Sequence, residues 1–130
     1  SEHPQAAKQR VDLKLLAQED FIIYPRQNGR ALFDLIISVC RDVGFSPKVL
    51  QIAPQMTSIV NLVATGIGLS IVPASIAQVT TPGVVYRPLR GTKARAELTL
   101  VRTPSSELRP ALVFTELVKK LAKATPRADE

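Results

Sequence analysis

Side chains that could perform acid–base or nucleophilic chemistry are few in this sequence. The 130 residues include one histidine, His3, and one cysteine, Cys40. A Ser-His-Asp or Cys-His arrangement needs a base held against its nucleophile, but His3 lies in a polar N-terminal arm. Cys40 falls on the apolar face of a predicted helix, where an inert thiol is expected. The carboxylates show no spacing typical of an acid–base or metal-binding pair, and they include Glu19, Asp20, Asp34, Asp42 and Glu97. We therefore expect no enzymatic activity, no bound metal and no cofactor.

The glycine pair in Gly66-Ile67-Gly68 superficially resembles a phosphate-binding loop. A dinucleotide fingerprint follows a strand and opens a helix, so that the helix N-terminus faces the phosphates. Here the glycines follow a predicted helix and precede a predicted strand. We interpret them as a helix cap followed by a close approach of the backbone into the strand.

Two segments are better suited to binding a ligand than to reacting with it. In open α/β sheets, ligands bind beyond the carboxyl ends of the strands, where helix N-termini point. The segment Tyr24-Pro25-Arg26 leads from the end of one predicted strand toward a helix, and Ala53 to Ser58 connects the next strand to a helix. The N–H groups of that first helical turn can meet a carboxylate, and Thr57 and Ser58 can add hydroxyls. The residues equally allow Thr57 or Ser58 to be only a helix cap.

These segments depend on an alternation of strands and helices. Apolar runs predict strands over Phe21 to Tyr24, Val49 to Ile52, Ile67 to Val72, Val84 to Tyr86 and Ala96 to Arg102. Helical spacing and caps predict helices over Ala31 to Val43, Pro54 to Gly66, a short stretch at Ala74 to Gln78, and Leu108 to Leu121, with a turn at Thr80 to Gly83. This order predicts an α/β fold with a mostly parallel sheet flanked by helices.

The composition is typical of a soluble folded domain. Apolar residues make up 45% of the chain, and its longest apolar runs fall far short of the roughly 20 residues that span a membrane. Seventeen basic and eleven acidic residues give a net charge of +6, but the charges are dispersed and only 5% of residues are aromatic. We therefore expect solvated surface charge rather than a nucleic-acid interface. Without an initiator methionine or signal-peptide pattern, the sequence is expected to be a cytoplasmic piece of a longer protein.

The run TSIVNLVATGIGLSIVPAS, from Thr57 to Ser75, resembles a hallmark stretch of LysR-type transcriptional regulators. It is similar to the part of their effector-binding half that combines a helix, a glycine-bounded turn and a strand ending in IVPAS. The flanks agree with the family as well. The connecting segment of the family resembles SEHPQAAKQRVDLKLLAQEDFI, the first strand of its regulatory subdomain II resembles FIIYP, and a later strand resembles GVVYRPL. The closing helix also resembles the last helix of the family, so the resemblance covers essentially the whole chain.

The resemblance implies a periplasmic-binding-protein-like (type 2) fold of two α/β subdomains with an effector in the cleft between them. Family effectors are often small carboxylates or aromatic acids, and promoter DNA is bound by an N-terminal helix-turn-helix domain absent from this sequence. Together with the strand-end argument, it gives the expected effector site as Tyr24, Pro54, Gln55, Met56, Thr57, Ser58, Val72 and Pro73.

The resemblance also implies a division of the chain. Residues 1–14 would be the connecting arm, 15–100 subdomain II, and 101–130 a return strand and helix belonging to an otherwise missing subdomain I. The last helix should then expose an apolar stripe, and we expect homo-oligomerisation through apolar helices. The leading hypothesis is an effector-binding fragment of a LysR-type regulator, and the alternative is a stand-alone solute-binding domain of the same fold.

Overall fold

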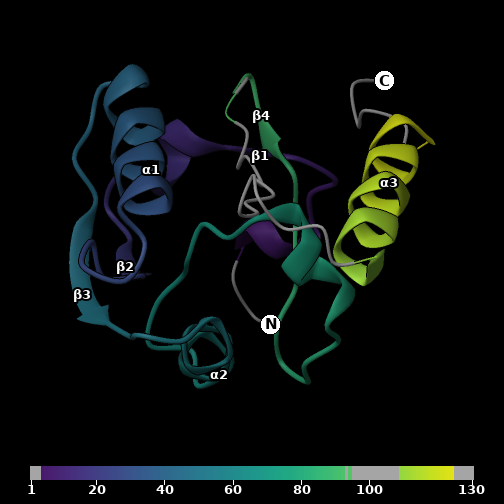
Figure 1. Ribbon diagram of the computed structural model, residues 1–130. Coiled ribbons are helices and arrows are strands. Elements are labelled where there is room, and N and C mark those ends of the chain that lie inside the picture. Colours follow the sequence, from purple (N-terminus) through teal and green to yellow (C-terminus); the bar gives the residue numbers. More distant parts are fainter. Residues whose placement is uncertain (1–3, 93, 95–108, 125–130) are drawn as a thin grey trace. The chain divides into compact units, whose positions relative to one another are not determined.

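The computed structural model describes residues 4–92, 94 and 109–124. The chain divides into two compact units, Ser1–Ala96 (unit 1) and Glu97–Glu130 (unit 2), and each is described by itself (Figure 1). In the part of the chain that the structure describes, no helix has the length and apolar character needed to cross a membrane.

Over residues 20–64, unit 1 alternates strands with helices in the predicted order. Its elements are η1 (Pro4–Ala7), β1 (Val11–Asp12), η2 (Leu13–Leu16), β2 (Asp20–Ile23), α1 (Arg30–Asp42), β3 (Lys48–Ile52), α2 (Met56–Ala64), η3 (Ala74–Gln78) and β4 (Leu89–Arg90), where η marks a 3-10 helix. Strand β2 pairs in parallel with β3, and β1 pairs in parallel with β4. The prediction of an α/β fold with parallel strand pairing is therefore confirmed.

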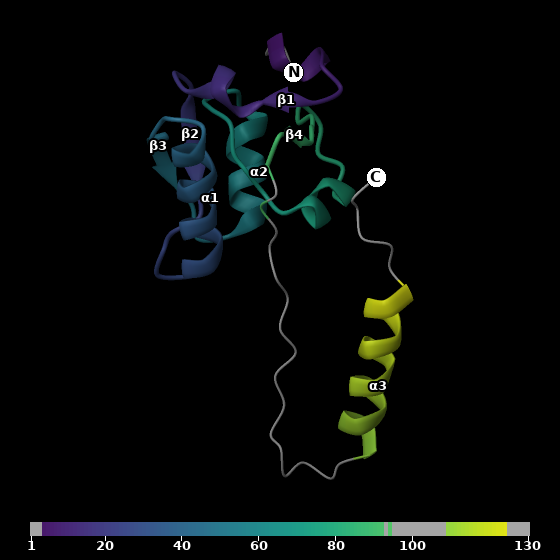
Figure 2. The same cartoon turned by 90° about the horizontal axis from the view of Figure 1, so that it is seen from above.

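Strand β2 lies at the centre of unit 1 because its side chains enter two different clusters. Phe21 and Ile23 are buried with Ile36 and Cys40 of α1, whereas Ile22 is buried with Ala53 and Ile59 on the side of α2. Successive side chains of a strand point to opposite faces, so α1 covers one face of β2 and α2 the other. Figures 1 and 2 both show α1 beside β2 and β3.

Both helices end at glycines, as predicted. Gly44 and Gly66 adopt the left-handed φ values of 94° and 82° that favour glycine. The N–H of Phe45 donates to the carbonyl of Cys40, and the N–H of Gly66 donates to that of Val63. These bonds satisfy carbonyls that the helix ends would otherwise leave unpaired.

The third predicted strand, Ile67 to Val72, is wrong as a regular strand. Only Leu69 pairs with β2, through an isolated parallel bridge to Phe21. The N–H of Ile22 donates to the carbonyl of Leu69 at 2.8 Å, and the N–H of Leu69 donates to that of Asp20 at 3.0 Å. Leu69 and Ile71 nevertheless pack with the α1 cluster and Val72 with the α2 cluster. The segment thus alternates like a strand, although its pairing is limited to one residue.

The fourth predicted strand, Val84 to Tyr86, is also wrong. Pairing begins later, where the N–H of Val11 donates to the carbonyl of Pro88 and β4 follows at Leu89. The side chain of Arg87 donates from Nε to the carbonyl of Ala6 at 2.9 Å, so the segment before β4 holds the N-terminal arm instead of extending the sheet. The predicted turn at Thr80 to Gly83 is present, because the N–H of Val84 donates to the carbonyl of Thr81. The short helix predicted at Ala74 to Gln78 is also present, as the 3-10 helix η3.

In unit 2 the described element is helix α3 (Arg109–Ala124), which confirms the predicted last helix. The expected exposed apolar stripe is present on it, with side chains of Val113, Phe114, Leu117 and Leu121 all more than half exposed. On its polar side, Lys119 Nζ lies 3.1 Å from Glu116 Oε1. The predicted strand from Ala96 to Arg102 lies outside the described residues.

Candidate functional site

The predicted binding segments begin at one edge of the β2–β3 pair. The N–H of Ala53 donates to the carbonyl of Ile23 at 3.1 Å, so the two strands end side by side. Tyr24, half-buried, starts the loop that leads to α1, and Pro54, exposed, starts the loop that leads to α2. Both segments therefore leave the carboxyl edge of the parallel pair, where ligands bind in open α/β sheets.

The start of α2 has no side-chain cap. Gln55 occupies the N-cap position with extended backbone angles, and its side chain makes no capping hydrogen bond. The capping interpretation of Thr57 and Ser58 is not what the structure shows, because both residues lie inside the first helical turn. The N–H groups of this first turn and the positive end of the helix dipole favour the binding of an anion at the start of α2. Thr57 is exposed and Ser58 half-buried beside these groups.

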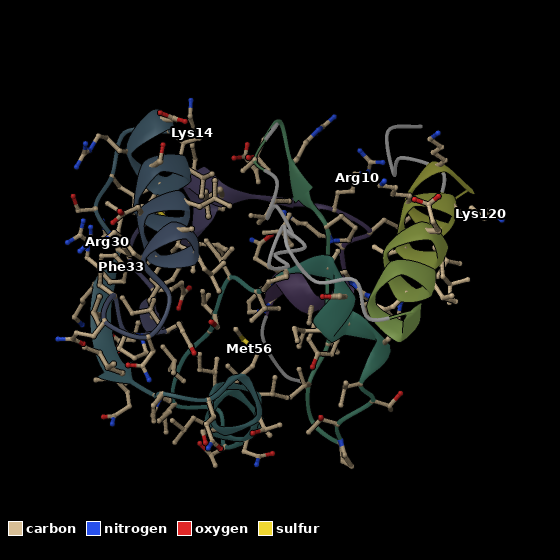
Figure 3. All side chains as sticks on the ribbon, viewed as in Figure 1. Arg10, Lys14, Arg30, Phe33, Met56 and Lys120 are labelled. Carbon is tan, nitrogen blue, oxygen red and sulfur yellow. The ribbon has the colours of Figure 1, made fainter. Side chains whose placement is uncertain are left out.

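Three of the predicted site residues contact one buried cluster although they belong to three separate segments. Tyr24, Met56 and Val72 all pack against the buried cluster of Ile22, Ala53 and Ile59. Figure 3 shows Met56 at the start of α2. Pro73, also half-buried, follows Val72 and precedes η3. Gln55 is exposed. The arrangement offers an apolar surface next to free N–H groups and hydroxyls, with no charged residue in the predicted set.

An ion pair next to the Tyr24 loop was not anticipated from the sequence. Arg26 donates from Nε and Nη2 to the two carboxylate oxygens of Asp34 on α1, at 2.9 and 3.2 Å. The hydrogen bond from Arg26 lowers the pKa of Asp34, and the same bond raises the pKa of Arg26. Nothing in the spacing of Arg26 and Asp34 identifies them as a pair, because they lie on opposite sides of a turn.

A second unanticipated contact involves Gly29. A Cβ atom built on Gly29 would lie 2.6 Å from Cε1 and 2.9 Å from Cδ1 of Tyr24. The tyrosine ring therefore rests directly on the glycine backbone. Asn-Gly is a common turn dipeptide, but no sequence signal indicates that Gly29 contacts Tyr24.

A small cavity of about 90 Å³ lies along α2 beyond its first turn. Its lining comprises Ile59, Val60, Val63, Leu69, Ser70, Val72, Val84, Val85 and Tyr86. It is smaller than the roughly 150 Å³ of an enclosed cavity that holds benzene. Of the predicted site residues only Val72 lines it, and we therefore treat it as separate from the candidate site.

The remaining reactive groups do not form a site within the described residues. Cys40 is fully buried, and burial raises the pKa of its thiol to about 11, so it is protonated at neutral pH. In the parts of the chain that the structure describes, no three His, Cys, Asp or Glu residues are grouped so that they could hold a metal ion. His3 lies outside the described residues.

Comparisons with known proteins agree with the resemblance. The sequence matches the family model described as "LysR substrate binding domain" over residues 1–122. It is 36% identical over 87 residues to the HTH-type transcriptional regulator TtuA of Agrobacterium vitis, covering 67% of this chain and 29% of TtuA. It is 32% identical over 112 residues to the HTH-type transcriptional regulator XapR of Escherichia coli, covering 86% of this chain and 37% of XapR.

Solved structures show the same fold. The effector binding domain of QuiR in complex with shikimate superposes with a TM-score of 0.68 at 23% identity, covering 94% of this chain and 57% of that one. The BenM effector binding domain with its effector benzoate gives a TM-score of 0.67 at 22% identity, covering 98% of this chain and 60% of that one. The periplasmic-binding-protein-like fold is thereby confirmed. The chain spans well under half the length of the two curated relatives, and because the family match covers nearly all of it, the chain belongs to the LysR substrate-binding domain family.

Proposed function

We propose that this chain is the effector-binding part of a LysR-type transcriptional regulator and that it senses a small carboxylate or aromatic metabolite without performing chemistry on it. The observation that carries the proposal is the uncapped start of α2 beside an apolar surface formed by Tyr24, Met56 and Val72. Free N–H groups at a helix start suit a carboxylate, and the apolar surface suits a hydrocarbon ring. The QuiR and BenM domains are described with shikimate and benzoate, which are both cyclic carboxylates.

In this proposal the effector contacts Pro54, Gln55, Thr57 and Ser58 through the backbone and polar groups at the start of α2. Tyr24, Met56, Val72 and Pro73 supply the surface against which its apolar part packs. The matched relatives are named as transcriptional regulators, which favours this role over a stand-alone solute-binding domain.

The proposed division of the chain follows the family pattern, with residues 1–14 as the connecting arm, 15–100 as subdomain II and 101–130 as part of subdomain I. The exposed apolar side chains of α3 support this division, because large exposed apolar patches typically mark interaction surfaces. In the full-length regulator we propose that subdomain I covers it, that homo-oligomers form through apolar helices, and that promoter DNA is bound by a separate N-terminal domain in the cytoplasm.

The test is a thermal-shift screen of small organic acids, including benzoate and shikimate, against the full-length protein. A ligand that binds only the native state stabilises it by about 2.7 kcal/mol at a concentration one hundred times its Kd. We expect at least one cyclic carboxylate to raise the Tm further with each tenfold increase in its concentration above the Kd, while its uncharged amide does not. If no acid in the panel raises the Tm, or if the amide acts as well as the acid, the proposed ligand class is wrong.

A further inference from the structure

Tyr24 is held in place by the loop that follows it. Within this loop the N–H groups of Asn28 and Gly29 both donate to the carbonyl of Pro25, at 3.1 and 3.2 Å, and Pro25 is buried. The N–H of Phe33 donates to the carbonyl of Gly29 at 3.0 Å, which joins the loop directly to α1. The two hydrogen bonds from Arg26 to Asp34 attach the loop to α1 a second time. The loop is thus closed on itself and fixed to the helix.

The backbone at position 29 does not itself require glycine. Gly29 has a φ of −163°, which is an extended conformation open to any residue. Glycine is required at this position because of the Tyr24 side chain, whose Cε1 atom lies 2.6 Å from where a Cβ would be. Ordinary contacts begin at 3.4 Å, so an alanine would push the ring away by about 0.8 Å. Glycine at this position therefore sets how closely the ring approaches the loop.

Tyr24 is also one of the residues of the candidate site. Tyr24 packs against the same buried cluster as Met56 and Val72, so a displaced ring changes its contact with that cluster. Binding geometry must be held to within about 0.5 Å to be productive. A displacement of about 0.8 Å is large on this scale.

We infer that Gly29 and the Arg26–Asp34 pair are positioning residues for the effector: they fix the Tyr24 ring as a wall of the site. This inference rests on the proposed function. Gly29 acts by direct contact with the ring, whereas Arg26 and Asp34 act through the loop. Gly29→Ala should therefore have the larger effect and Asp34→Asn a smaller effect in the same direction.

The experiment measures binding of benzoate and shikimate by calorimetry to full-length wild type, Gly29→Ala, Asp34→Asn and the control Asp42→Asn, which makes the same change in the last turn of α1. Whichever acid binds wild type should bind Gly29→Ala about tenfold more weakly. Asp42→Asn should bind like wild type. Aromatic NMR spectra, assigned with Tyr24→Phe, should show that Gly29→Ala shifts the ring signals of Tyr24 and leaves those of Tyr86 in place.

A double-mutant cycle separates positioning from a general loss of structure. In a Tyr24→Leu background there is no ring to displace, so adding Gly29→Ala should change the Kd by less than twofold. If wild type binds and Gly29→Ala binds equally well, or if the tenfold loss persists without the ring, the inference is wrong while the proposed function stands. If wild type binds neither these two acids nor any other acid of the thermal-shift panel, the proposed ligand class fails and the inference falls with it.

Discussion

Gly68→Ala should disrupt the contact that holds the segment leading to Val72 and Pro73 against β2. A Cβ at Gly68 would lie 2.6 Å from the carbonyl oxygen of Asp20, which is backbone and cannot rotate away. To reach the ordinary contact distance of 3.4 Å, the two chains must separate by about 0.8 Å. That separation breaks the bonds from Leu69 to Asp20 and from Ile22 to Leu69, now 3.0 and 2.8 Å long.

The expected cost follows from these two bonds. Each backbone hydrogen bond contributes about 1 kcal/mol net, so losing both costs about 2 kcal/mol locally. Native-state hydrogen exchange reports such local opening at individual amides. The amides of Ile22 and Leu69 should exchange roughly thirtyfold faster in Gly68→Ala than in wild type.

The matched control is Gly66→Ala, the same substitution two residues earlier. Gly66 has open space around it but a φ of +82°, so alanine there strains the end of α2 without touching β2. Its Ile22 and Leu69 amides should keep wild-type protection. If Gly68→Ala leaves these amides protected, or if both variants expose them equally, the close approach at Gly68 does not hold this segment.

Three further predictions concern the site, the core and the thiol. Thr57→Val removes a hydroxyl at the start of α2, so it should weaken the transcriptional response to the effector without changing DNA affinity in a mobility-shift assay. An unchanged dose–response curve would exclude Thr57 from the site. Ile59→Ala should lower the free energy of unfolding by about 2–5 kcal/mol, because the Ile59 side chain is 1% exposed beneath the site. The control Val79→Ala, at a 55% exposed position, should change it by less than about 0.5 kcal/mol, and equal effects in denaturant titrations would contradict this packing. Burial raises the pKa of Cys40 to about 11, so the folded protein keeps a proton there that the unfolded chain loses above about pH 9. The free energy of unfolding should therefore fall as the pH rises from about 9 toward 11, and Cys40→Ala should abolish that part of the pH dependence.

Much of the fold of unit 1 follows from local sequence signals. Helix α1 begins and ends within one residue of its predicted bounds, because helical spacing and the glycine after its C-terminus are both local signals. Strand β2 was predictable because an apolar run buried on both faces has a distinct composition. The strands predicted at Ile67 to Val72 and Val84 to Tyr86 do not form, since a strand also requires a partner over its length. Leu69 alone finds that partner in the first case, and Pro88 and Leu89 find it instead of Tyr86 in the second.

The candidate site was predictable only in outline. Strand order and helix starts indicated the segments at Tyr24 and Pro54, because these depend on topology. The contact of Gly29 with Tyr24 and the pairing of Arg26 with Asp34 depend on how a turn folds back in space. No periodicity or spacing rule contains that information.

The most direct test of the account is the amide NMR spectrum of the full effector-binding half, titrated with the cyclic acid that stabilises the protein. We expect the backbone amides of Met56, Thr57 and Ser58 to shift most strongly and to saturate with the Kd found by calorimetry. Saturable shifts confined to another part of the domain, with these three amides unmoved, would contradict the claim that the first turn of α2 receives the effector.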